Sequence, residues 1–405
     1  MTPPLDAYQD RRTRREAAVR RESRRDDRVV LSRAATAALA VALAIGAWKG
    51  TWGWGWIAVA VLLFVVLVVL HDRVLRAKAR ADRAVAHYDA GIARIEERWA
   101  GTGRDGSRHA PEHHPYAADL DLFGPGSLFE RVNTTRTGAG EATLSTWLLS
   151  PATPRTIRDR QLALEELKPR LELREDLALA GDAVAAEVHP DRLRAWARSP
   201  ARPFPLPLRM LAAILGACGL VSLLTWLSGA TTAIPFAIFG VLNGSLALAA
   251  RRRVVAIVHD ADRPGAELRV LSEVLARIER EPFESEPLRE LRAALDSDGA
   301  APSAAIASLA KRLDWMELRR NQLVAPFAAV ALWTTQMAMA VEAWRARHGA
   351  AVSRWVDACG EIEALAAMSA CAFENPNDPF PDIVEGPGRF EAEALGHPLI
   401  PTARC

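Results

Sequence analysis

Two closely spaced glycines in residues 136–168 (RTGAGEATLSTWLLSPATPRTIRDRQLALEELK) raise the question of phosphate binding. Gly138 and Gly140 precede an expected helix, and the backbone N–H groups at the start of a helix commonly hold phosphate. A P-loop, however, requires the pattern GxxxxGKS or GxxxxGKT, which occurs nowhere in the 405 residues. We therefore interpret the two glycines as the entry of a helix. The sequence predicts no cofactor-binding residue and no catalytic residue.

Metal and thiol chemistry have equally weak signals. Three histidines, His109, His113 and His114, cluster in RHAPEHHPY, but a histidine cluster flanked by prolines is typical of a solvated loop. The cysteines are Cys218, Cys359, Cys371 and Cys405. Because they form no CxxC pair, neither a zinc site nor a disulfide framework is expected, and no metal ligand is assigned. This cysteine usage favours an intracellular chain.

The first structural element that the sequence predicts is a membrane hairpin. Half of the residues are hydrophobic and the net charge is only +2, but residues 1–33 are strongly basic. Between Arg11 and Arg33 there are ten arginines and four acidic residues. Such a run directly before an apolar stretch marks the cytoplasmic flank of a membrane helix. We predict a basic cytoplasmic tail over 1–33 and a transmembrane hairpin over 34–70, with a tryptophan-rich turn.

A second hairpin is predicted over residues 204–250. Met210–Ser228 and Ala230–Ala250 carry no charge, and both are long enough to cross a bilayer. Arginines precede the pair and Arg251–Arg253 follow it, so both hairpins have their basic ends on the same side. The sequence therefore predicts a multi-pass protein of the cell membrane whose N-terminus, helical parts and C-terminus are cytoplasmic. A secretory signal peptide is disfavoured, because a second apolar segment follows the first at once.

The 19 uncharged residues from Leu323 to Val341 are a fifth candidate span. Arginines flank both of their ends, so the positive-inside rule gives no direction. Thr334, Thr335 and Gln336 lie at the centre, where unpaired polar groups would be costly in lipid. We interpret this segment as a buried helix.

The remaining segments show helical periodicity, and the fold class expected is mainly α. The expected parts are a helix and linker over 71–118, a helical region over 119–203, and long helices over 251–385. Within the second part, a helix over Glu141–Leu149 ends at Pro151, and Thr153 caps the next helix with Pro154 at its first position.

The third part has its own expected boundaries. A helical stretch from about Glu317 to Cys371, weakly interrupted at Gly349 and Gly360, ends at ENPNDPFPD. The following GRFEAEALGHPLIPTARC has a strand-like start.

These residues carry a family resemblance. The stretch 136–168 resembles the start of the core helical domain of MutS-type DNA mismatch repair proteins. The matching residues are Thr137, Gly140, Leu144, Trp147, Leu148, Pro151, Ile157, Arg160 and Gln161. EALAAMSACAFENPNDPFPDI resembles the end of the returning lever helix, and GRFEAEALGHPLIP, with Gly396, His397 and Pro398, resembles the first strand of the MutS ATPase domain. The resemblance covers about residues 119–200 and 254–405.

The resemblance implies a membrane-associated, MutS-related protein that binds DNA and uses ATP and magnesium. Residues 386–405 would be the start of a truncated ATPase domain, whose nucleotide motifs would lie after residue 405. Dimerisation would run through that domain. The mismatch-reading domain of the family is not recognisable, and membrane hairpins interrupt the core.

Two other functions stay open at this point. One is a non-catalytic membrane scaffold whose helical domain binds a protein partner, since many arginines are interleaved with glutamates as on a solvated helix surface. The other is the transmembrane subunit of an ABC-type transporter, which the lack of charges within the four spans disfavours.

Overall fold

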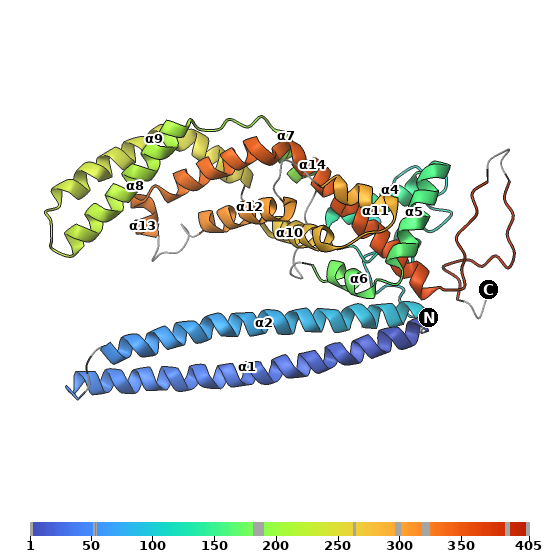
Figure 1. The fold of residues 1–405 in the computed structure, drawn as a ribbon, viewed down its shortest axis with the longest axis horizontal. Helices are drawn as coiled ribbons and strands as arrows, with labels where there is room; N and C mark the ends of the chain where they lie inside the picture. Colours follow the sequence, from blue (N-terminus) through green and yellow to red (C-terminus); the bar gives the residue numbers. More distant parts are fainter. Residues whose placement is uncertain are drawn as a thin grey trace. The chain divides into compact units, whose positions relative to one another are not determined.

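The protein is mainly helical, as predicted (Figure 1). The computed structural model describes residues 3–51, 53, 55–180, 190–261, 265–295, 301–317, 325–384 and 389–401, and these contain no β-strand. The chain divides into two compact units: residues 1–103, 371–379 and 392–405 form unit 1, and residues 104–370 and 380–391 form unit 2.

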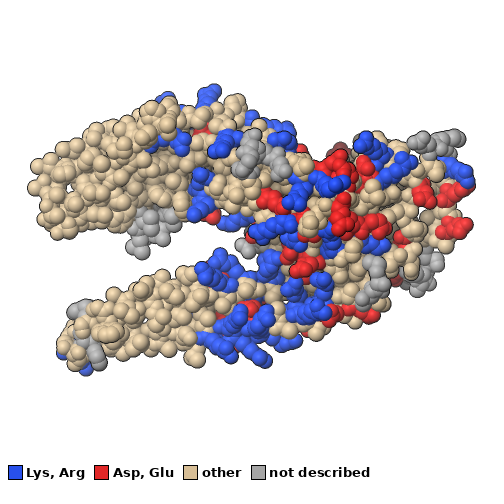
Figure 2. Space-filling model, in the orientation of Figure 1, with Lys and Arg blue, Asp and Glu red and all other residues tan. Residues whose placement is uncertain are grey.

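Unit 1 is built on a pair of long antiparallel helices, α1 (Pro4–Trp48) and α2 (Gly55–Ile95). Residues 4–33 of the predicted basic tail are helical and continue without a break into the apolar part of α1. Ion pairs one helical turn apart, such as Arg12–Glu16 at 2.9 Å, stabilise this basic half. Figure 2 shows Lys and Arg side chains gathered on one half of the pair and an uncharged surface on the other.

Small and aromatic residues let the charged halves of α1 and α2 pack closely. A Cβ atom on Gly91 would lie 2.6 Å from the Tyr8 ring, so only glycine fits there without movement. Tyr8 and Tyr88 are buried, with ring centroids 5.6 Å apart. The apolar turn of the hairpin falls partly outside the described residues, which omit Trp52 and Trp54.

Unit 2 surrounds a long helix, α14, which spans Trp333–Glu374 and contributes its last turn from Cys371 to unit 1. The other elements are η1 (Ser107–His109), α3 (Leu128–Val132), α4 (Gly138–Leu149), α5 (Pro154–Leu167), α6 (Leu171–Ala178), α7 (Pro190–Arg198), α8 (Leu206–Leu227), α9 (Ile234–Ala261), α10 (Gly265–Arg280), α11 (Glu286–Ala293), α12 (Pro302–Glu317) and α13 (Ala325–Val330). Fully buried Trp355 and Ile362 of α14 belong to the same core as Leu275 of α10 and Ile306 of α12.

Four described helices are long and apolar enough to cross a membrane, which agrees with the predicted spans. They are α1, α2, α8 and α9. Only small parts of their apolar windows are buried within the protein. Large exposed side chains such as Leu62, Val66, Leu211 and Val241 cover their surfaces, as expected for helices that face lipid.

The long helical stretch expected from about Glu317 to Cys371 breaks at a position that the sequence did not indicate. The chain forms two helices, α13 and α14, separated at Ala331 and Leu332, and Leu332 has a positive φ of 51°. Residues 318–324, including the start of the fifth candidate span, lie outside the described residues. In contrast, Gly349 and Gly360 do not interrupt α14, which ends at Glu374 before the predicted Pro/Asn breaker.

Polar side chains compensate the carbonyl groups that this break releases. Gln336 Nε2 donates to Ala331 O at 2.8 Å, and Asn243 Nδ2 of α9 donates to Val330 O at 2.9 Å. Asn243 also donates to Leu215 O of α8 at 3.2 Å. Gln336, one of the polar residues that argued against a fifth span, therefore donates a hydrogen bond to a carbonyl group at the helix break. Such a carbonyl group needs a donor from the protein where water is excluded.

Replacing Asn243 by Leu is expected to lower the free energy of unfolding by about 1–2 kcal/mol, because two partly buried carbonyl groups lose a donor. Thermal unfolding of the chain in detergent measures this loss. Ser245→Ala is the matched control, since Ser245 is exposed on the same helix. Equal melting of the two variants would contradict a stabilising role for Asn243.

The expected strand near the C-terminus is also wrong for the described part. Residues 389–401 are irregular and largely exposed. Their contacts are local: Leu399 N donates to His397 Nδ1 at 3.2 Å, Ile400 N donates to His397 O at 3.1 Å, and Arg389 pairs with Glu391.

Candidate functional site

The helix–proline–helix segment forms as predicted, with one shift at its start. Thr137 caps α4 by accepting a hydrogen bond from Gly140 N at 3.0 Å, so Gly138 and Gly140 lie inside the first turn rather than before it. Thr153 caps α5 by accepting from Thr156 N at 3.2 Å, and Pro154 occupies the first helical position. The cap takes the N–H group that a phosphate would otherwise accept from at this helix start.

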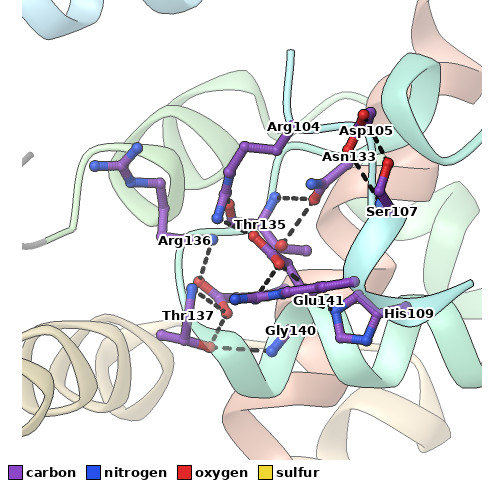
Figure 3. Close-up of polar contacts among 12 residues, drawn as sticks. Arg104, Asp105, Ser107, His109, Asn133, Thr135, Arg136, Thr137, Gly140 and Glu141 are labelled. Atoms are coloured by element: carbon purple, nitrogen blue, oxygen red, sulfur yellow. Dashed lines mark hydrogen bonds and ion pairs between the residues drawn. The ribbon is translucent and has the colours of Figure 1, made fainter. Parts of the chain in front are cut away.

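A buried carboxylate from α14 fills the position in front of α4. Glu363 Oε1 accepts from Arg136 N at 3.1 Å, and Oε2 accepts from Thr137 N at 3.2 Å and from the Thr137 hydroxyl. Figure 3 shows dashed lines at the backbone N of Arg136 and at Thr137, next to Gly140. Burial raises the pKa of Glu363 above its ordinary value, although the three hydrogen bonds oppose the shift. The protein's own carboxylate therefore occupies the anion site of the helix start.

The glycines of this segment allow two helices to approach. A Cβ atom on Gly140 would lie 2.9 Å from Glu363 Cβ and 2.9 Å from Thr135 Cβ. On the facing helix, a Cβ atom on Gly360 would lie 2.8 Å from Ala139 O. Because real Cβ atoms do not approach this closely, glycine is required at both positions for the contact between α4 and α14. This packing role explains Gly140 of the GxG pattern.

A second buried carboxylate binds the preceding loop to α4. Glu141 pairs with Arg104 and Arg108, and His109 Nε2 lies 3.6 Å from its Oε2 (Figure 3). Arg104 also donates to Thr135 O. Burial alone would raise the pKa of Glu141, but the hydrogen bond from His109 and the two arginines lower it. We call this set, together with Thr137 and Glu363, the α4–α14 joint.

The structure separates the histidines that the sequence groups together. His109 joins the Glu141 cluster, His114 Nε2 lies 2.9 Å from Leu149 O, and His113 is exposed. Within the described ranges, no group of three His, Cys, Asp or Glu residues has a metal-binding arrangement.

The described cysteines form no disulfide. They are Cys218, Cys359 and Cys371, and Cys405 lies outside the described residues. Burial raises the pKa of Cys359 well above its ordinary value, with smaller contributions from Glu363 and Glu279. A thiol in such surroundings stays protonated and is a poor nucleophile.

Other residues of the segment attach α5 to the chain that follows α14. Gln161 Nε2 donates to Pro381 O at 2.8 Å, and Arg158 donates to Ile383 O at 2.7 Å. The Arg160 guanidinium stacks over the Trp147 ring at 3.7 Å. Sequence periodicity gave no signal for these long-range contacts or for Glu363.

The two carboxylates of the joint are buried and already paired within the protein. Glu141 and Glu363 are 3% and 2% exposed, and their oxygens already accept hydrogen bonds or form ion pairs within the protein. Two satisfied carboxylates hold the loop at 104–109, α4 and α14 in fixed register.

Comparison of the chain with protein-family models, curated proteins and solved structures found no match in any of the three. The resemblance to MutS-type proteins therefore stays a prediction.

Proposed function

We propose that this chain is the membrane-anchored lever region of a MutS-related protein and that it transmits movement rather than performing chemistry. The observation that supports this most is the course of α14 (Figure 1). Gln336 lies beside the α8–α9 hairpin, where it is 3.5 Å from Ala212 O, and Glu363 forms the joint with α4. The two positions lie on one continuous helix, about 40 Å apart at the rise of an α-helix.

The family resemblance adds the source of the movement. ATP and magnesium would act in an ATPase domain after residue 405, through which the protein would dimerise. DNA would be bound through its phosphates by basic helices, without base readout. In this proposal the arginine-flanked ends of both hairpins, the helical units and the C-terminus are cytoplasmic.

DNA binding is the testable part of this function. If the proposal is right, the chain in lipid nanodiscs binds labelled duplex DNA, and its affinity falls at least about tenfold between 50 and 200 mM salt, as phosphate contacts require. Fluorescence anisotropy measures both affinities, and empty nanodiscs are the control. No binding at 50 mM salt, or binding insensitive to salt, would remove DNA from the proposal.

A non-catalytic scaffold that binds a protein partner is the second candidate, and the charge pairing in unit 2 favours it. Arg170 pairs with Glu166 and Glu281, and Arg277 pairs with Asp176 and Glu281. Arginines that are neutralised in this way contribute little to a phosphate-binding surface. A chain that shows no salt-dependent DNA binding would support this candidate.

A further inference from the structure

A small basic cavity lies beside α9, just after the uncharged segment of that helix ends. Its volume is about 140 Å³, and its lining includes Trp196 of α7, Arg202 before α8, Arg253 of α9, and Glu342 and Arg345 of α14. A single water needs only about 10–15 Å³ by the same measure. The cavity therefore has room for a small polyatomic group.

The lining has an excess of positive charge. Three guanidinium groups share the cavity with one carboxylate, Glu342. Glu342 is 3% exposed, and it accepts hydrogen bonds from Arg202 N and from Arg345 Nη2 at 2.8 Å. Arg345 forms an ion pair with Glu342 and so neutralises its charge. Neither Arg202 nor Arg253 pairs with a carboxylate in the part of the chain that the structure describes. An anion is the ligand that such a lining favours.

Two of the guanidinium groups have buried donors that the protein does not use. Arg253 Nη2 and Arg345 Nε are buried and have no hydrogen-bond acceptor among the described residues. Both side chains are nevertheless fixed in position: Arg253 stacks over the Phe204 ring at 3.7 Å, and Arg345 Nη1 donates to Ser199 Oγ at 2.8 Å. A buried polar group without a partner is rare and calls for a ligand or a water. Fixed guanidinium groups match the geometry of phosphate oxygens.

The place of the cavity identifies the source of the phosphate. Arg253 follows the uncharged stretch 230–250 by three residues, about 5 Å along the helix. In Figure 2, Lys and Arg side chains begin where the uncharged surface of the α8–α9 hairpin ends. Lipid phosphates lie just outside the hydrocarbon core, and basic pockets beside membrane helices bind anionic headgroups. Trp196 adds an aromatic ring of the kind enriched at this depth.

We propose that this cavity binds the phosphate group of an anionic phospholipid. Because its lining joins the chain before α8, the exit of α9 and α14, a bound lipid would hold the long helix against the hairpin. The binding requires neither DNA nor ATP, so it goes beyond the function proposed above.

Titration of the delipidated chain with phosphatidylglycerol tests this site. Native mass spectrometry counts the bound lipids, at about 0.5 M salt so that exposed charges are screened. The wild-type chain is expected to bind one lipid in preference to phosphatidylcholine. Arg253→Gln is expected to weaken this binding roughly tenfold or more, because it removes a charged hydrogen-bond donor. Arg251→Gln is the matched control: Arg251 is exposed on the same helix, does not line the cavity, and should bind as the wild type does.

A second variant tests the site in case Arg253→Gln fails to fold. Arg202 is exposed and contacts Glu342 through its backbone, so Arg202→Gln should keep the fold and still weaken lipid binding several-fold. Equal binding by wild type, Arg202→Gln and Arg251→Gln would overturn the site. Equal affinity for phosphatidylcholine would overturn the anionic specificity. Displacement of the lipid by micromolar inorganic phosphate would show a site for free phosphate and overturn the assignment to lipid.

Discussion

Replacing Glu363 by Ala is expected to lower the free energy of unfolding by about 3 kcal/mol, because two backbone N–H groups and one hydroxyl at the start of α4 lose their acceptor. The donors are Arg136 N, Thr137 N and Thr137 Oγ1. Each unsatisfied buried donor costs about 1–3 kcal/mol, and the release of a buried carboxylate offsets part of the sum. Thermal or urea unfolding of the chain in detergent measures the loss.

Glu361→Ala is the matched control for this variant. Glu361 is exposed two residues earlier on the same helix, so its replacement should change stability by no more than about 0.5 kcal/mol. If both variants unfold alike, the carboxylate of Glu363 does not hold the joint.

The two carboxylates of the joint make opposite contributions to the pH dependence of stability. The pKa of Glu363 is raised above its ordinary value of 4.5, so the folded protein binds this proton more tightly than the unfolded chain. Its contribution is therefore most favourable below pH 4.5 and declines as the pH rises from there through the folded pKa. The pKa of Glu141 is lowered, so its contribution is present above pH 4.5 and is lost as the pH falls through the folded pKa.

Glu363→Gln separates the two effects, since it keeps the shape of the side chain and removes its titration. As the pH rises from about 4 to 7, the unfolding free energy of the wild type should fall relative to that of Glu363→Gln. A difference that does not vary over this range would contradict the raised pKa.

Local sequence signals predicted the long apolar helices and the start of α5. The uncharged runs gave the four long apolar helices, and Thr153 with Pro154 gave the start of α5. Such features depend on residues within a few positions of one another, so periodicity and capping preferences are enough to find them.

The features that the sequence did not predict depend on distant residues. Glu363 lies 226 positions from Thr137, and nothing near either residue indicates their hydrogen bond. The break at Leu332 was missed for the same reason, because Asn243 of α9 and Gln336 of α14 together satisfy the released carbonyl groups. The three arginines of the basic cavity come from separate elements and show no common pattern in the sequence.

The second large effect is expected at Arg94, which holds the ends of unit 1 together. Arg94 binds Glu374 through two hydrogen bonds, of 2.8 and 2.6 Å, and Tyr8 Oη donates to the same carboxylate at 3.1 Å. The side chains of Arg94 and Glu374 are 11% and 4% exposed. Burial alone would lower the pKa of Arg94, but the charge and hydrogen bonds of Glu374 raise it, so Arg94 stays charged.

Arg94→Met is expected to lower the free energy of unfolding by about 3–5 kcal/mol, because it leaves the carboxylate of Glu374 buried without its counter-charge. The expected loss should be seen as a lower melting temperature in detergent. Arg98→Met is the control: Arg98 pairs with Glu96 on the surface, where its side chain is 65% exposed, and its loss should cost at most about 1 kcal/mol.

Removal of both charges should reverse most of this destabilisation. In the double variant Arg94→Met, Glu374→Leu no charge stays buried, and apolar replacements of a buried ion pair are often nearly neutral. Its stability should lie within about 1–2 kcal/mol of the wild type, with the remaining loss due to the Tyr8 hydroxyl that has lost its acceptor. A double variant less stable than Arg94→Met alone would contradict this account, because it would mean that Glu374 stabilises unit 1 through contacts other than Arg94 and Tyr8.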